Sequence, residues 1–91
     1  MMYSYNKTHI FDRFNPHDKS LIFRFDIYQY GDKIDSVTFK TYEDAQKFFY
    51  RHYHVYECGE KLYIDDEYVS FVEAYEFFKL SELNSRLWGR D

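Results

Sequence analysis

The fold is decided by a stretch of sequence that occurs twice, as IYQYGDKI at residues 27–34 and as VYECGEKL at residues 55–62. The copies share their Tyr, Gly and Lys, and all but one of the other positions are conservative replacements. The match resumes beyond the turn, where FKTYEDAQKFF at residues 39–49 parallels YVSFVEAYEFF at residues 68–78. An internal repeat predicts one structural unit built twice. We expect each unit to be a β-hairpin followed by a helix.

Strict alternation of apolar side chains predicts a half-buried strand at the start of the first unit. The side predicted to face inward carries Leu21, Phe23, Phe25 and Ile27. The side predicted to face outward carries Ile22, Arg24, Asp26 and Tyr28. In the second unit, the corresponding open-face residues are predicted to be His54 and Tyr56.

The turn of the first hairpin is predicted at Gly31-Asp32, a tight-turn sequence. A two-residue loop would place Phe25 opposite Thr38. A loop one residue longer pairs Phe25 with Phe39, and Ile27 with Val37. Burial favours this second register, because it sets apolar side chains opposite one another.

The second hairpin is predicted to turn at Gly59-Glu60, where a two-residue loop sets Val55 opposite Ile64. This loop is shorter than the one expected in the first unit. The two copies are therefore expected to differ by a bulge.

Two hydroxyl residues, Thr41 and Ser70, are each followed three positions later by an acid, Asp44 and Glu73. This spacing is a capping box, which satisfies free backbone N–H groups at the start of a helix. It predicts one helix from Tyr42 to about residue 51 and another that starts after Ser70. The predicted inward positions are Tyr42, Ala45, Phe48 and Phe49 in the first helix, and Phe71, Ala74, Phe77 and Phe78 in the second.

The predicted fold is a single α+β domain over residues 1–91, with a roughly four-stranded antiparallel sheet and both helices on one face. Its parts are an N-terminal arm at 1–20, a first unit at 21–52, a second unit at 53–80 and a C-terminal helical tail at 81–91. The arm is expected to be extended, with a turn at residues 15–18, and to lay its aromatic side chains over the core.

The tail continues the helical spacing of apolar residues with Leu80, Leu83 and Leu87, next to Trp88. Two arrangements fit this stripe. It folds back on the same chain, or it binds a partner protein or a second copy in a homodimer.

Composition excludes several classes of protein. Aromatic residues make up 24% of the chain, more than so short a chain can bury, and Tyr suits binding surfaces. The net charge of −4 gives no field that would attract phosphate backbones. The single Cys58 excludes an internal disulfide, and no apolar run approaches the roughly 20 residues of a membrane span. We expect a cytoplasmic protein.

Catalytic and metal-binding motifs are not found in the sequence. His52, His54 and Cys58 match no zinc-site spacing. The cluster Asp65-Asp66-Glu67 lies on a connector, where neighbouring carboxylates diverge instead of holding one Mg²⁺ ion. We therefore expect no enzyme activity, no metal and no cofactor, and interpret the acids as a contact patch for a basic surface.

These observations predict a small non-enzymatic protein-binding module. Its composition, rich in Tyr, Phe, Lys, Asn and Ile, is typical of accessory proteins of phages and mobile elements. The expected partner is a host defence protein, which an inhibitor of the anti-CRISPR or anti-restriction type would block. The residues predicted to bind it are Tyr28, Tyr56, Tyr63, Asp65, Asp66, Glu67, Tyr68, Leu83, Leu87 and Trp88.

The alternative is a nucleic-acid-binding domain that stacks bases on the open sheet face and meets phosphates with arginines. Net acidity makes nucleic acid the less favoured partner. The residues predicted for this alternative are Arg13, Arg24, Tyr28, His54 and Tyr56.

Overall fold

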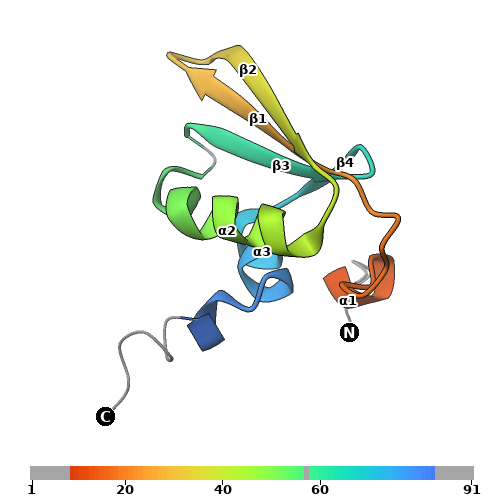
Figure 1. Ribbon diagram of the computed structural model, residues 1–91. Coiled ribbons are helices and arrows are strands. Elements are labelled where there is room, and N and C mark those ends of the chain that lie inside the picture. Colours follow the sequence, from red (N-terminus) through yellow and green to blue (C-terminus); the bar gives the residue numbers. More distant parts are fainter. Residues whose placement is uncertain (1–8, 57, 84–91) are drawn as a thin grey trace, which may run out of the picture.

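The computed structural model describes residues 9–56 and 58–83. The elements in chain order are α1 (Ile10–Arg13), β1 (Phe23–Gln29), β2 (Asp32–Phe39), α2 (Tyr42–His52), the 3-10 helix η1 (Tyr53–Val55), β3 (Glu60–Ile64), β4 (Glu67–Val69) and α3 (Phe71–Phe77). The strands form one antiparallel sheet in the order β2-β1-β3-β4, and α2 and α3 lie on the same side of it (Figure 1). The α+β class is therefore confirmed.

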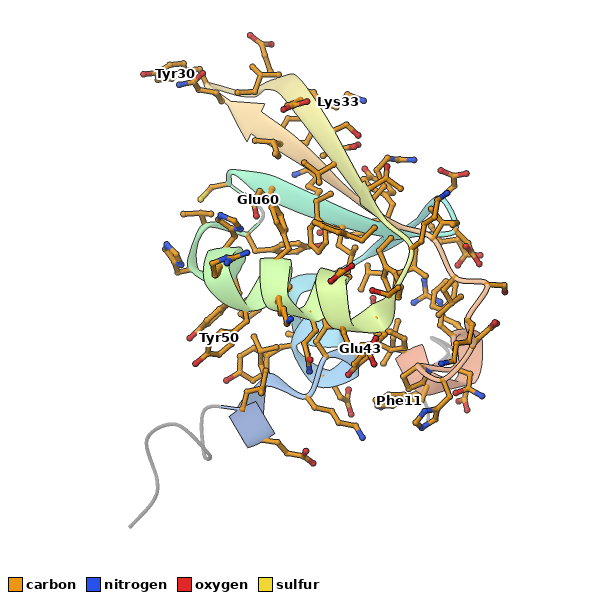
Figure 2. The ribbon with its side chains drawn as sticks, viewed as in Figure 1. Phe11, Tyr30, Lys33, Glu43, Tyr50 and Glu60 are labelled. Carbon is orange, nitrogen blue, oxygen red and sulfur yellow. The ribbon has the colours of Figure 1, made fainter. Side chains whose placement is uncertain are left out.

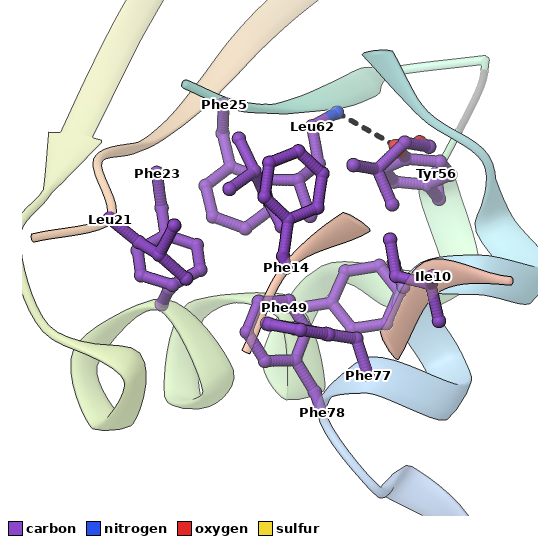
Figure 3. Packing of buried hydrophobic residues seen from close by; sticks show 14 of the residues in the cluster. Ile10, Phe14, Leu21, Phe23, Phe25, Phe49, Tyr56, Leu62, Phe77 and Phe78 are labelled. Carbon is purple, nitrogen blue, oxygen red and sulfur yellow. Dashed lines mark hydrogen bonds between the residues drawn. The ribbon is translucent and has the colours of Figure 1, made fainter. Parts of the chain in front are cut away.

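Phenylalanine side chains fill the layer between the sheet and the helices (Figure 3). Phe23 and Phe25 point down from β1, where the ring of Phe23 lies 5.9 Å from that of Phe78 and the ring of Phe25 lies 6.5 Å from that of Phe49. Phe49 and Phe78 are themselves 5.5 Å apart, which joins α2 to the end of α3. The inward face predicted for β1 is confirmed.

Both predicted helix starts are confirmed by their caps. The Thr41 hydroxyl accepts from the Asp44 N–H at 3.2 Å, and the Ser70 hydroxyl accepts from the Glu73 N–H at the same distance. The Glu73 carboxylate in turn accepts from the Ser70 N–H at 3.0 Å, which completes a capping box at α3.

The prediction of a helix that continues unbroken past Phe77 is wrong. α3 ends at Phe77, whose carbonyl accepts a 2.8 Å hydrogen bond from the Tyr42 hydroxyl. Lys79 then takes a left-handed backbone conformation with φ 56°, and a further helical turn covers residues 80–83. This change of chain direction at Lys79 places Leu80 fully inside the core.

The first hairpin turns at Tyr30 and Gly31, one residue earlier than predicted. Both residues have positive φ, 54° and 84°, as a two-residue hairpin turn of type I′ requires. Tyr30 stands at the far end of the hairpin (Figure 2) and is 95% exposed.

The predicted register of this hairpin is also wrong. Phe25 lies opposite Val37 instead of Phe39, and Ile27 lies opposite Asp35 instead of Val37. A bulge follows Ile27, where the pairing shifts by one residue. The observed register still sets inward residues opposite inward residues, because it differs from the predicted one by an even number of positions.

The second copy of the repeat does not form the predicted hairpin. Residues 53–55 are the 3-10 helix η1, and the strand after Gly59, β3, pairs with β1, so that Ile64 lies opposite Phe23 rather than Val55. The second hairpin is β3–β4, which turns at Asp65-Asp66. Thr41 and Ser70 each cap a helix, but the hairpins differ, and the predicted tandem repeat of one hairpin-helix unit is not confirmed.

The described part of the N-terminal arm, residues 9–20, covers the core as expected, but it is not extended throughout. It includes the short helix α1, Ile10 and Phe14 are buried, and the ring of Phe11 is stacked 5.7 Å from that of Phe77. The predicted turn after it is present, since Asp18 N–H donates to the carbonyl of Asn15 at 2.9 Å.

Candidate interaction surface

The face of the sheet that points away from α2 and α3 carries a continuous set of polar and aromatic side chains. β1 contributes alternate residues, and the strand pairing aligns each with residues on the neighbouring strands. We call this set the open face: Arg24, Asp26, Tyr28, Ser36, Thr38, Lys61, Tyr63 and Tyr68.

Arg24 is the centre of the open face. Its Nε donates to Asp26 at 3.0 Å, its terminal nitrogen forms an ion pair with Asp66, and its guanidinium carbon lies 4.6 Å from the centre of the Tyr63 ring. The hydrogen bond to Asp66, ahead of the interactions with Asp26, raises the pKa of Arg24. The guanidinium is therefore permanently charged and held in one orientation.

Asp26 is only 4% exposed although it points to the open face. Besides Arg24, its carboxylate accepts from the Ser36 hydroxyl at 3.2 Å and lies 3.9 Å from the Lys33 ammonium. A buried carboxylate is tolerated when cations and donors surround it in this way. Asp26 therefore links β1 to β2 and restrains the orientation of the Arg24 side chain.

Tyrosines flank this ion-pair network. The rings of Tyr63 and Tyr68 lie 5.7 Å apart at a steep angle across the β3–β4 pair. On the other side, the Lys61 ammonium lies 5.1 Å from the centre of the Tyr28 ring. Tyr28, Tyr63 and Tyr68, three of the predicted partner-binding residues, thus share one face.

The three acids of the predicted contact patch diverge, as the sequence indicated. Asp65 and Asp66 form the β3–β4 turn, with φ of 50° and 68°. Asp65 accepts from the N–H of Ile22 at 3.0 Å, Asp66 binds Arg24, and Glu67 lies 3.2 Å from Arg13. Each carboxylate has its own partner, and only Asp66 joins the open face.

Arg13, predicted to meet phosphates, pairs with carboxylates of its own chain. It forms ion pairs with Glu73 at 3.0 Å and Glu67 at 3.2 Å, and its guanidinium lies over the Phe14 ring. Because Arg24 is also paired with two acids, both arginines of the nucleic-acid prediction have carboxylate partners.

The placement of Tyr56 and His54 on the open face is wrong. Tyr56 is 7% exposed, and its hydroxyl donates to the carbonyl of Val69 and accepts from the N–H of Leu62 at 2.7 Å (Figure 3). His54 lies in η1 instead of a strand, and it is exposed. The cause is the 3-10 helix, which replaces the strand expected here.

The C-terminal residues are only partly described. Leu83 is half-buried and packs against the core, next to the fully buried Leu80. Leu87 and Trp88 lie outside the described residues.

Sequence reasoning missed a buried carboxylate, Glu60, on the inward face at the start of β3. It is 7% exposed, and burial raises the pKa of Glu60, while the nearby His52 and His54 lower it by a smaller amount. The Nδ1 atom of His52 lies 3.9 Å from the carboxylate. Within residues 9–56 and 58–83, no three His, Cys, Asp or Glu side chains converge as metal ligands.

Comparisons with family models, with curated proteins and with solved structures each returned no significant match. None of the helices in the described part of the chain has the length and apolar character needed to cross a bilayer.

Proposed function

We propose that this protein is a small non-enzymatic binding module that recognises another protein through the open face. The observation that carries the proposal is the fixed guanidinium of Arg24, held between Asp26, Asp66 and the ring of Tyr63. Arg and Tyr are the residue types that most often dominate the energetics of protein interfaces.

Preorganisation is the physical reason why this face suits a partner. Binding normally immobilises long side chains at a cost of about 0.5–1.5 kcal/mol each. Here Arg24 and Tyr63 are already restrained by their contacts, so less entropy remains to be lost on docking. The alternation of Lys61, Arg24 and Asp66 favours a partner surface of mixed charge.

We propose that the partner is a bacterial defence protein, which the module blocks by occupying its surface in the cytoplasm. The support is compositional: a short, Tyr- and Phe-rich, weakly acidic chain of the kind typical of phage and mobile-element accessory proteins. An inhibitor of the anti-CRISPR or anti-restriction type needs no catalytic group of its own.

Affinity capture from bacterial lysate with matched variants tests the proposal. Tyr68→Ala together with Tyr63→Ala should weaken capture of a specific protein by about tenfold or more, since interface tyrosines contribute on the order of 2 kcal/mol. Lys47→Ala, an exposed change on α2, serves as the control and should leave capture unchanged. Equal capture by the wild type and the double variant, both shown folded by circular dichroism, would refute the role of the open face.

The second candidate is single-stranded nucleic acid, because Tyr28, Tyr63 and Tyr68 present rings on one face beside Lys61. Mobility shifts at low and moderate salt decide this point. Binding that falls steeply with salt and needs the three tyrosines supports this candidate. No binding at low salt removes it.

We further propose that the chain arose by duplication of a hairpin-helix unit. The support is the match between Thr41 with α2 and Ser70 with α3, each preceded by a strand. A later change in the second copy, from strand to 3-10 helix at residues 53–55, accounts for the difference between the hairpins.

A further inference from the structure

Arg24 has one carboxylate partner that is held in place and one that can be exchanged. Its Nε donates to Asp26, whose side chain is only 5% exposed, whereas its terminal nitrogen Nη1 pairs with Asp66, whose side chain is 83% exposed. An ion pair that stands in solvent contributes little to stability, because water screens the charges. The Asp66 carboxylate can therefore leave Arg24 at small cost, while Asp26 stays.

The guanidinium of Arg24 also has unused donors. Nη2 has no hydrogen-bond partner among the described residues, and Nη1 donates only to Oδ1 of Asp66. The two terminal nitrogens form the fork with which arginine binds both oxygens of one carboxylate. Asp66 uses only one side of this fork, so the same place can hold a carboxylate in better geometry than Asp66 provides.

The fork keeps its position without Asp66. The ring of Tyr63 lies 4.6 Å from the guanidinium carbon, and Asp26 is itself held by the Ser36 hydroxyl and the Lys33 ammonium. A ligand that binds the fork therefore does not have to order the arginine side chain, which lowers the entropic cost of binding.

The charges near the fork favour a carboxylate as the ligand. Charges of both signs lie on or beside the open face in the described part of the chain, namely the cations Arg24, Lys33 and Lys61 and the acids Asp26, Asp65 and Asp66. Exchange of the Asp66 carboxylate for another carboxylate leaves the balance at the fork unchanged. A nucleic-acid strand would instead bring a row of phosphates against these acids and against the net charge of −4.

We propose that the open face binds an acidic segment of its protein partner, in which an Asp or Glu carboxylate takes both terminal nitrogens of Arg24 in place of Asp66. Asp66 is then an internal stand-in that occupies the fork until the partner binds. This inference rests on the proposed function, because it names the group that the partner presents to the open face.

Asp66→Asn tests the exchange directly. Asp66 has φ 68°, a conformation that asparagine tolerates as well as aspartate does, so the turn is kept while the competing carboxylate is removed. The probe is poly-L-glutamate, and binding is measured by NMR from the Arg24 Nε–Hε signal and from the backbone amide signals of Asp26 and Tyr63. We expect this variant to bind the probe about two- to fivefold more tightly than the wild type does, the range that corresponds to the loss of one exposed ion pair.

Two further variants separate the fork from charge alone. Glu43→Gln removes one negative charge at an exposed position on α2, across the sheet from the open face (Figure 2), and should leave binding unchanged. Arg24→Lys keeps the positive charge but lacks the fork, and should weaken binding of the probe by about tenfold or more. Circular dichroism establishes that each variant is folded.

Three outcomes would overturn the inference. The first is an Asp66→Asn variant that binds the probe no more tightly than Glu43→Gln does, absence of binding included. The second is unchanged binding by folded Arg24→Lys. The third is a shift of the Arg24 signal by oligodeoxythymidylate but not by poly-L-glutamate, which would assign the fork to nucleic acid.

Failure of the proposed function gives a different result. Capture of a protein from lysate would then be unaffected by Tyr63→Ala with Tyr68→Ala, whatever Asp66→Asn does to the binding of poly-L-glutamate. Conversely, capture that needs the two tyrosines but is indifferent to Arg24→Lys and Asp66→Asn would keep the open face as the interface and remove the carboxylate from its fork.

Discussion

Removal of one hydroxyl, by Tyr56→Phe, should destabilise this protein far more than such a conservative change usually does. The Tyr56 hydroxyl lies inside the core and joins two strands, since it accepts from the Leu62 N–H of β3 and donates to the Val69 carbonyl of β4. Phenylalanine keeps the ring and its packing against Phe49 at 5.4 Å, so the change removes the hydroxyl and, with it, these two hydrogen bonds.

The magnitude follows from the two backbone groups that lose their partner. An unsatisfied buried donor or acceptor costs about 1–3 kcal/mol, so loss of both should lower the free energy of unfolding by about 2–6 kcal/mol. For a domain of this size, at about 4–8 °C per kcal/mol, Tm should fall by about 10–50 °C.

Thermal and urea unfolding followed by circular dichroism measure this difference. The control is Tyr50→Phe on α2, because the Tyr50 hydroxyl makes no hydrogen bond within the described residues; its change should stay within about 0.5 kcal/mol. If Tyr56→Phe is as stable as Tyr50→Phe, the hydroxyl does not bridge the strands and the account of this half of the core is wrong.

Three further changes test separate features. Burial raises the pKa of Glu60 above 4.5, so the folded state holds this proton more tightly than the unfolded state does. The stability of the wild type should therefore fall as pH rises through the raised pKa. Glu60→Gln should lose this pH dependence and be more stable than the wild type at neutral pH. Equal pH profiles for the two proteins in urea titrations would contradict the burial of Glu60. Ser70→Ala removes the N-cap of α3 and should cost about 1 kcal/mol, with Ser70→Gly costing less; equal losses would argue against the cap. Gly31→Ala should cost about 1–2 kcal/mol through backbone strain alone, since φ is 84° and the added methyl meets nothing within 4 Å; an unchanged Tm would contradict this turn geometry.

The parts of the fold that sequence predicted well depend on local signals. Thr41 and Ser70 mark the helix starts because their hydroxyls bind N–H groups only three residues away. Alternation assigned Phe23 and Phe25 to the core for a similar reason, since side chains on a strand change face at every residue.

The positions of the turns are harder to predict from sequence, because residues other than glycine adopt the left-handed backbone conformation in them. Tyr30 takes φ 54° although tyrosine gives no turn signal, and this moved the first turn by one residue. Asp65 and Asp66 were interpreted as a contact patch, yet Asp tolerates this conformation and the pair forms the second hairpin turn.

The sequence predicts individual residues of the candidate site but not that they lie together on one face. Sequence singled out Arg24, Tyr63, Asp66 and Tyr68 for separate reasons. Their convergence depends on the pairing of β1 with β3, two strands about forty residues apart, and no local pattern encodes that contact. Tyr56 was misplaced because the repeat equated it with Tyr28, although a 3-10 helix precedes only Tyr56.

The β1–β2 hairpin extends beyond the rest of the sheet, so its tip can open while the core stays folded. β3 pairs with β1 only from Phe23 to Ile27, and the N–H of Tyr28 makes the last bond to the body, to Gly59. Past that point, in the described part of the chain, β1 and β2 pair only with each other. Amide protons near Gln29 and Asp32 should therefore exchange with solvent through fraying of the tip, while those of Phe25 and Leu62 should wait for global unfolding. A protease that cuts at Tyr30 would meet little resistance and would leave the core assembled.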